Sequence, residues 1–73
     1  MAAYEVKAEV TGSIWKIMTE VGQALQPGDT ILIVESMKME IPVIAEDGGT
    51  IREFLVVEGQ SVAEGQVVAR IET

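Results

Sequence analysis

Residues 12–35 read GSIWKIMTEVGQALQPGDTILIVE, and residues 49–72 repeat the same pattern as GTIREFLVVEGQSVAEGQVVARIE. A shift of 37 positions places residues 4–36 over residues 41–73 without a gap. Nine of the 33 aligned positions are identical, whereas composition alone would give roughly two or three. Arrays of small repeats usually need three or more units. Two copies in this chain therefore indicate one domain made of two similar halves, neither of which can bury a core alone.

Each half has the alternating pattern of β-strands. Residues 67–72 alternate between two faces, which predicts a strand with one buried and one solvated side. The inward face would carry Val67, Ala69 and Ile71, and the outward face Val68, Arg70 and Glu72. The equivalent run TILIVE, residues 30–35, places Leu32 and Val34 inward. Turn-forming residues stand at matching places in the two halves, at 22–23 and 59–60 and again at 27–29 and 64–66.

One irregularity occurs in both halves. The apolar pairs Ile14/Ile17 and Ile51/Phe54 are spaced by three, which does not suit a flat strand. Because both halves share this spacing, we interpret it as a β-bulge or bend; a helix over residues 14–21 is the alternative. Short strands at regular spacing predict a small sandwich or flattened barrel, an architecture that protects its edges.

A pseudo-twofold axis between the halves would place the centre of the chain at one end of the domain. The position equivalent to Lys38 is residue 1, and the chain ends at residue 73. The central turn should therefore lie at the end opposite both termini, where it would be presented to a partner.

Composition excludes several classes of function. The chain has no cysteine and no histidine, which removes disulfides, zinc sites built on those residues, and Ser-His or Cys-His nucleophiles. A net charge of −7 argues against nucleic-acid binding, which needs clustered basic residues. No apolar stretch reaches the roughly 18 residues of a membrane span, and the N-terminus lacks a signal-peptide pattern. We expect a monomeric, cytoplasmic protein that binds no metal.

The central turn, ESMKME at residues 35–40, departs from ordinary turn chemistry. A two-residue hairpin loop normally uses Asn-Gly, Asp-Gly or Gly-X, and none of these is present. Places where local rules fail are often functional sites. Alternatively, Met37 and Met39 could pack on the core while Lys38 merely solvates the turn. The residues by themselves leave both interpretations open.

The segment Glu35-Ser36-Met37-Lys38-Met39 resembles the biotin-attachment motif of biotinyl domains, in which Met-Lys-Met carries the modified lysine. The Gly-Gln and Gly-Asp turns before it, and the GGTI and EGQ runs after it, are similar to that family's flanks, so that the resemblance covers essentially the whole chain. It implies an all-β flattened barrel of two four-stranded antiparallel sheets with pseudo-twofold symmetry. Residues 1–73 would form a single biotinyl domain.

Three features bear on the subfamily. Ser36 stands where many members have Ala, and Glu9-Val10-Thr11-Gly12 stands where many have Pro-Met-Pro-Gly. The two halves align without a gap, so that the chain lacks the thumb insertion of some bacterial acetyl-CoA carboxylase carriers. The initiating Met and the absence of a linker favour a free-standing protein over the C-terminal end of a longer carboxylase.

The resemblance implies a carrier without catalytic activity of its own. A biotin protein ligase would form biotinyl-adenylate, and the Lys38 amine would attack its acyl carbon to make an amide. The ligase would recognise the flanking residues Glu35, Ser36, Met37, Met39 and Glu40. The biotin arm would then carry CO₂ from a biotin carboxylase to a carboxyltransferase.

Elementary acid–base chemistry agrees that a partner does the activation. An ordinary lysine amine, with a pKa of about 10.4, is neutral in only about one molecule in a thousand near pH 7. The sequence provides no neighbouring base for Lys38. Recognition must then depend on shape, and thioether side chains such as Met37 and Met39 suit an adaptable apolar contact.

Other functions are compatible with parts of the pattern. Lipoyl domains share the symmetric barrel, but their lysine usually lies in Asp-Lys-Ala rather than Met-Lys-Met. An unmodified β-barrel interaction module is a further alternative. A hydrolase built on Glu46 and Asp47 is disfavoured, because adjacent strand residues point to opposite faces.

Overall fold

The computed structural model describes residues 2–73, which form eight β-strands and no helix. The first four strands are β1 (Ala3–Lys7), β2 (Gly12–Ile17), β3 (Ala24–Leu25) and β4 (Thr30–Ser36). The second four are β5 (Met39–Ile44), β6 (Gly49–Phe54), β7 (Ser61–Val62) and β8 (Val67–Glu72). The all-β prediction is confirmed, and the helical alternative for residues 14–21 is wrong.

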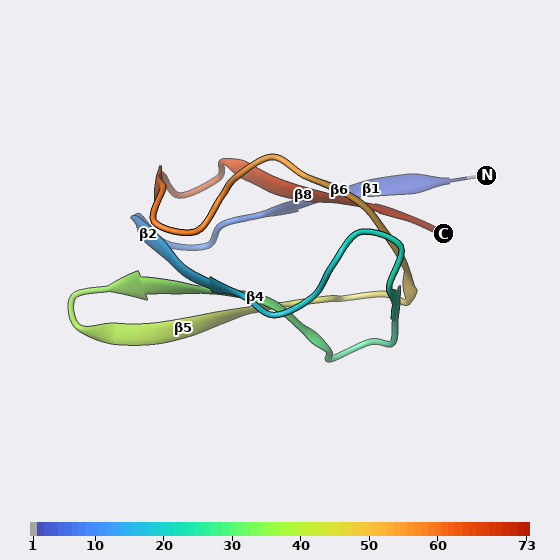
Figure 1. The fold of residues 1–73 in the computed structure, drawn as a ribbon, viewed down its shortest axis with the longest axis horizontal. Helices are drawn as coiled ribbons and strands as arrows, with labels where there is room; N and C mark the ends of the chain where they lie inside the picture. Colours follow the sequence, from blue (N-terminus) through green and yellow to red (C-terminus); the bar gives the residue numbers. More distant parts are fainter. Residues whose placement is uncertain (1) are drawn as a thin grey trace.

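The strands form two four-stranded antiparallel sheets, in the orders β1-β8-β6-β3 and β5-β4-β2-β7. Figure 1 shows them as two layers along the long axis of the molecule. Replacing each strand by its counterpart in the other half, β1 by β5, β2 by β6 and so on, converts one order into the other. The predicted pseudo-twofold symmetry is therefore confirmed. Each sheet takes a short strand from the opposite half, because β3 pairs with β6 and β7 pairs with β2.

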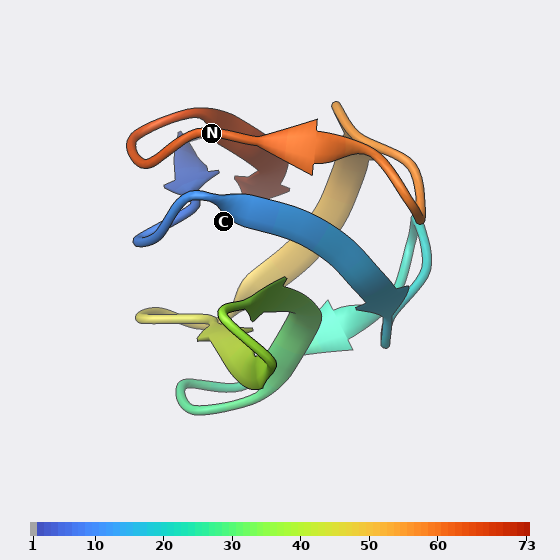
Figure 2. The same cartoon turned by 90° about the vertical axis from the view of Figure 1, so that its left-hand side faces the viewer.

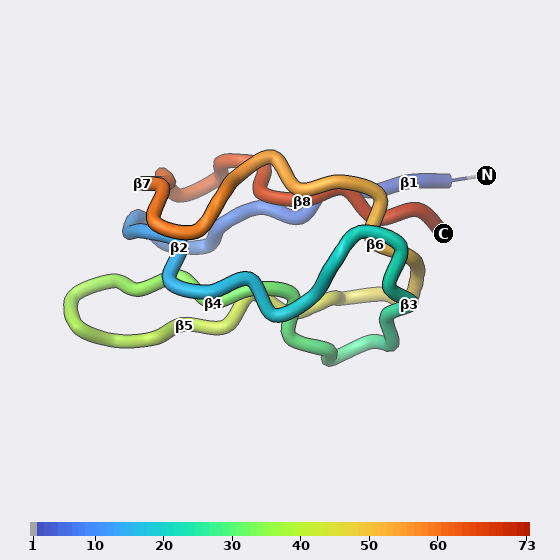
Figure 3. Tube along the Cα trace, in the orientation of Figure 1, coloured from blue at the N-terminus to red at the C-terminus, as the bar shows by residue number. Residues whose placement is uncertain are grey.

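The symmetry extends to hydrogen bonds between the loops. Gly22 N donates to Ile51 O (2.8 Å), and at the equivalent place Gly59 N donates to Ile14 O (2.7 Å). The loops that make these bonds cross between the sheets at matching positions (Figure 3). The turns are closed by side chains in the same manner in both halves: Gln23 Oε1 accepts from Glu20 N, and Gln60 Oε1 accepts from Val57 N.

The shared spacing of three residues is a β-bulge, as predicted. The register between β2 and β4 shifts between Ile14 and Lys16, and the register between β6 and β8 shifts between Ile51 and Glu53. In both cases the extra residue, Trp15 or Arg52, has no direct partner in the register with the sheet's central strand.

A second pair of bulges, in β4 and β8, turns inward a side chain that was predicted to face solvent. Val68, expected on the solvated face, is fully buried, and so is its counterpart Ile31. The register of β8 with β1 skips Val68, and that of β4 with β5 skips Ile31. Because the bulge adds one residue, strict alternation is lost and two successive side chains turn inward.

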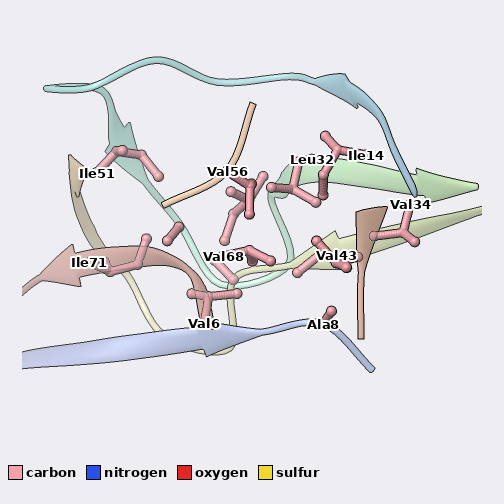
Figure 4. Close-up of a cluster of buried hydrophobic side chains, with 14 of the residues drawn as sticks. Val6, Ala8, Ile14, Leu32, Val34, Val43, Ile51, Val56, Val68 and Ile71 are labelled. Atoms are coloured by element: carbon pink, nitrogen blue, oxygen red, sulfur yellow. The ribbon is translucent and has the colours of Figure 1, made fainter. Parts of the chain in front are cut away.

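The core is apolar and draws on all eight strands. Its seven largest fully buried side chains are Ile14, Ile31, Leu32, Val34, Ile51, Val68 and Ile71. Figure 4 labels six of them, all except Ile31, among the other aliphatic side chains of the core. No polar or charged side chain of the described residues is buried, so that apolar packing supplies the stability of the interior.

The two termini lie at one end of the molecule and the turn between β4 and β5 at the other (Figure 1). This arrangement confirms the predicted place of the central turn; residue 1, the position equivalent to Lys38, is outside the described residues. Figure 2, viewed from the end that carries this turn, shows the strands surrounding the interior. In the described part of the chain, no helix has the length and apolar character needed to span a bilayer.

Candidate modification site at the turn between β4 and β5

The strands β4 and β5 are joined by a two-residue loop of Met37 and Lys38. Ser36 pairs with Met39 at the end of the ladder. Both loop residues have positive φ, 52° for Met37 and 65° for Lys38, as in the type I′ turns that suit the twist of a hairpin. A non-glycine residue in this region costs roughly 1–2 kcal/mol. The tip therefore holds a conformation that its own residues disfavour.

The strands on either side impose this conformation. Between β4 and β5 the register contains six residue pairs, from Thr30↔Ile44 to Ser36↔Met39. Val34 and Val43, one on each strand, are buried in the core. Because the register and the core fix both strand ends, the two residues between them have no freedom to relax.

The base of the hairpin is also attached to the start of β2. Ser36 Oγ donates a hydrogen bond to Thr11 O (2.8 Å), and Thr11 Oγ1 accepts one from Glu64 N (3.1 Å). Gly12 lies directly against the backbone carbonyl of Glu35, where an added Cβ would collide with the oxygen. These contacts connect the tip to the loops before β2 and β8.

The two methionines are exposed. Met37 is 92% and Met39 is 63% accessible to solvent, and Lys38 is exposed between them. The interpretation that these methionines pack on the core is therefore wrong. Two large apolar side chains are displayed to water on either side of an amine, which is unfavourable unless a partner covers them.

Of the predicted site residues, the structure gathers all six in one hairpin end. Glu35 and Glu40 face each other across the ladder, and Ser36 faces Met39. None of the ion pairs formed within residues 2–73 involves Lys38, Glu35 or Glu40. The arrangement can offer an unpaired primary amine to a partner's pocket, and such an amine suits amide formation with the carboxyl group of a cofactor. The chain has no histidine that could act as a base on this amine.

Two residues that support the site, Gly12 and Thr11, were not predicted from the sequence. Gly12 and its counterpart Gly49 were visible as an identity in the repeat, but not as positions of close backbone approach. An added Cβ at Gly49 would lie 2.7 Å from Glu72 O, which repeats the Gly12–Glu35 contact in the other half. The repeat could not point to Thr11, because the equivalent position 48 is a glycine rather than a threonine.

Two symmetric sheets and a lysine exposed at a strained hairpin tip are the features of a small carrier domain. The chain belongs to the biotin/lipoyl attachment family, whose model, described as "Biotin-requiring enzyme", matches residues 2–71. The resemblance found in the sequence is thereby confirmed.

Relatives of similar length support this assignment. The chain is 36% identical over 66 residues to the biotin/lipoyl attachment protein of Bacillus subtilis, covering 90% of both chains. It is 35% identical over 69 residues to the biotinylated protein TB7.3 homolog of Mycobacterium leprae, covering 94% of this chain and 97% of the relative.

A solved structure with a similar fold belongs to a much longer protein. The urea carboxylase of Kluyveromyces lactis matches 97% of this chain with a TM-score of 0.92 and 35% identity. The match spans only 6% of that carboxylase. The chain thus corresponds in fold to a small part of that carboxylase.

Proposed function

We propose that this protein is a biotin carboxyl carrier and that Lys38 bears the biotin through an amide bond. The observation that supports this most directly is the exposed, unpaired lysine on a hairpin tip whose backbone is held by the core. Residues 1–73 act as a single biotinyl domain. The relatives named for biotin attachment and biotinylation support the choice of cofactor.

Attachment requires a biotin protein ligase as partner. The Lys38 nitrogen forms a bond to the acyl carbon of biotinyl-adenylate, the bond from that carbon to the phosphate oxygen breaks, and AMP departs. A base of the ligase takes the proton from the amine, because this chain has no histidine to do so. Met37 and Met39 contribute apolar contact area to the ligase, and Glu35 and Glu40 contribute charge.

Ser36 has a positioning role in this scheme. Its hydroxyl bonds to Thr11 O, which holds the hairpin base against β2. A rigid tip delivers the amine in one geometry, and correct placement of two reacting groups can supply much of the rate enhancement.

The loaded carrier serves two further partners, a biotin carboxylase and a carboxyltransferase. The bound biotin supplies a carrier of CO₂ between them. Tethering converts a free cofactor into one held at high effective concentration near both sites. The protein itself is a cytoplasmic, monomeric, non-catalytic component; the similarity to a urea carboxylase domain supports the carboxylase assignment.

Co-expression with a biotin protein ligase and biotin tests the proposal. The intact mass should increase by one biotinyl group, and Lys38→Arg should keep the mass of the bare chain. Lys7→Arg and Lys16→Arg are matched controls, since these are the other two lysines, and both should be modified like the wild type. A biotinyl group on Lys38→Arg would exclude Lys38 as the attachment point.

A lipoyl cargo is the second candidate, because the family includes lipoyl attachment and the Bacillus subtilis relative is named for both. Blots of the protein isolated from its own cells with avidin and with an anti-lipoyl antibody distinguish the two. The biotin proposal requires an avidin signal without an anti-lipoyl signal.

A further inference from the structure

The pseudo-twofold symmetry provides an internal comparison of the two outer sheet faces. Equivalent positions have the same place in the fold, so that folding makes the same demands on both. Yet four outward positions of the sheet that carries the tip are apolar, whereas their counterparts are charged. The pairs are Trp15/Arg52, Ile33/Arg70, Pro42/Glu5 and Ile44/Lys7.

Three of these apolar residues, Trp15, Ile33 and Pro42, lie on the neighbouring strands β2, β4 and β5. Leu32 and Val34 are fully buried, so that Ile33 between them faces outward. Ile33 lies opposite Pro42 on one side and Lys16 on the other. Trp15 adjoins Lys16 in the bulge, and 46% of its surface is exposed.

The opposite face shows that the fold has no need of this apolar surface. There Arg70 pairs with Glu5 (3.6 Å) and Glu53 (3.4 Å), and Arg52 pairs with Glu72 (3.7 Å). These three ion pairs are all those formed within residues 2–73. The outer face of the β1-β8-β6-β3 sheet thus carries charges that form ion pairs with one another. The outer face of the sheet next to Lys38 instead exposes a tryptophan.

The same face carries an unneutralised pair of acids next to the tip. Glu35 and Glu40 are directly opposite each other, and like charges in such positions are destabilising. Their counterparts are Glu72, which Arg52 neutralises, and Ala3. Basic groups on a partner would relieve this repulsion.

We propose that this surface, which we call the tryptophan face (Trp15, Ile33, Pro42, Glu35 and Glu40), is a docking surface for the biotin protein ligase. The inference rests on the proposed function and extends ligase contact from the tip to the outer face of the sheet. The complementary ligase surface has an apolar pocket for the indole and basic side chains opposite the two carboxylates. Tryptophan is the residue type most typical of binding hot spots.

Distance favours the ligase over the carboxylase subunits as occupant. Ile33 is four residues before Met37, which at ~3.3 Å per residue is ~13 Å from the tip. An interface of about 800 Å² per partner has a radius of about 16 Å. A lysine side chain reaches only about 6 Å, so that a ligase holding Lys38 must approach the protein closely. An interface of this size centred on the tip extends as far as Ile33, next to the strand that carries Trp15. The carboxylase sites, in contrast, meet the end of the longer biotinylated arm.

Fluorine NMR of the single tryptophan tests the contact without altering the surface by mutation. The protein labelled with 5-fluorotryptophan is titrated with ligase in the absence of ATP, so that no transfer occurs. The resonance should shift or broaden on addition of ligase. In the matched control Trp15→Phe/Arg52→Trp, which moves the indole to the equivalent position of the other sheet, the resonance should stay unchanged.

Biotinylation kinetics provide the second measurement. Trp15→Arg introduces the residue that the other half has at this position, and should lower kcat/KM of the ligase for the carrier about tenfold, through KM. Arg52→Ala should change it less than twofold. Thermal unfolding shows whether both variants are folded. If Trp15→Arg is unstable, the fluorine NMR titration still tests the proposal, because it uses the wild-type chain.

The outcomes separate the two proposals. An unmodified wild-type chain would refute the proposed function and this inference with it. A biotinylated wild type with an unchanged kcat/KM in folded Trp15→Arg, or a resonance insensitive to ligase, would overturn only the docking surface. A resonance that responds to a biotin carboxylase subunit instead, or to carrier concentration alone, would overturn the choice of the ligase as occupant.

Discussion

At the scale of the residue, the site depends on a conflict between local preference and position. Met37 and Lys38 both hold left-handed backbone angles that Asn or Gly would adopt more readily. Asn or Gly at either position would stabilise the hairpin. At position 37 it would remove the apolar side chain of Met37, and at position 38 it would remove the amine of Lys38. The conflict is consistent with selection for binding at this tip.

Replacement of Met37 by asparagine tests the conformational part of this account. Met37→Asn should raise the free energy of unfolding by about 0.5–1 kcal/mol, because Asn tolerates positive φ. Urea unfolding measures the change. Met39→Asn is the matched control, since Met39 lies in the extended strand β5 and should show no gain. Equal stabilisation by both variants would mean that the turn is unstrained.

Moving the lysine by one position tests register. The chains Met37→Lys/Lys38→Met and Lys38→Met/Met39→Lys should both keep the bare mass after co-expression with ligase. Successive residues around the tip leave the backbone in different directions, so that the amine would enter the ligase from the wrong side. Efficient biotinylation of either chain would show that exposure of a lysine suffices.

At the scale of the element, the hairpin depends on its contact with β2. An added methyl group at Gly12 would meet the carbonyl of Glu35 and would lie 3.1 Å from Val34 Cγ1. The nearest atom belongs to the backbone of β4, which cannot move aside as a flexible side chain can. Gly12 is therefore required by the approach of two strands rather than by a turn.

Gly12→Ala should lower the free energy of unfolding by about 2–3 kcal/mol, in the range of overpacked sites. Gly48→Ala is a suitable control, because its nearest atom, Leu25 O, would be 3.2 Å away; we expect a loss below about 1 kcal/mol. Urea unfolding of both variants provides the comparison. Similar losses in the two would contradict the specific contact between β2 and β4.

At the scale of the whole molecule, neither half of the chain contains a complete sheet. The short strands β3 and β7 each pair with a strand of the opposite half. The core likewise combines Ile14, Leu32 and Val34 from one half with Ile51, Val68 and Ile71 from the other. The two copies of the repeat are thus mutually dependent for both hydrogen bonds and burial.

Separated halves should consequently be unfolded. Peptides of residues 1–37 and 38–73 should each give a random-coil circular dichroism spectrum and poorly dispersed amide resonances, whereas the intact chain gives the dispersion of a β-protein. The physical reason is that each half leaves one face of its core and two strand edges exposed to water. A folded spectrum from either peptide would refute this dependence.

Alkaline pH should weaken a contact between the halves. Tyr4 on β1 donates its hydroxyl to Asp47 O (2.7 Å) in the second half. Burial, and to a smaller extent the nearby Asp47 and Glu46 carboxylates, raise the pKa of Tyr4. Because the folded-state pKa exceeds the unfolded value of 10.0, this contribution is fully present below about pH 10 and is lost as the pH rises through the folded pKa.

Tyr4→Phe isolates this contribution. The variant should lose about 1 kcal/mol of stability at neutral pH, from the missing hydrogen bond, and should show a smaller further loss above pH 10 than the wild type. Urea unfolding across this pH range measures both effects. Tyrosine absorbance gives an independent check, since Tyr4 is the only tyrosine. A parallel decline in the two proteins would assign the alkaline loss to other groups.

The sequence by itself determined the features that depend on local chemistry. Periodicity and turn residues predicted the strands and a bulge or bend between Ile14 and Ile17 and between Ile51 and Phe54. The repeat placed the Met37-Lys38 turn away from the termini. The motif predicted the biotin/lipoyl family. The strands and the place of the turn needed only the chain's own spacing, whereas the family came from the resemblance of the motif to known biotinyl domains.

Only the tertiary structure decided what depends on residues distant in the chain. It turned Ile31 and Val68 inward through bulges, because the register with a neighbouring strand determines where an extra residue goes. It imposed positive φ on Met37 and Lys38, since two strands anchored in the core leave no other path between them. It also placed Trp15, Ile33 and Pro42 on the three neighbouring strands β2, β4 and β5, an arrangement that is absent from any single stretch of sequence.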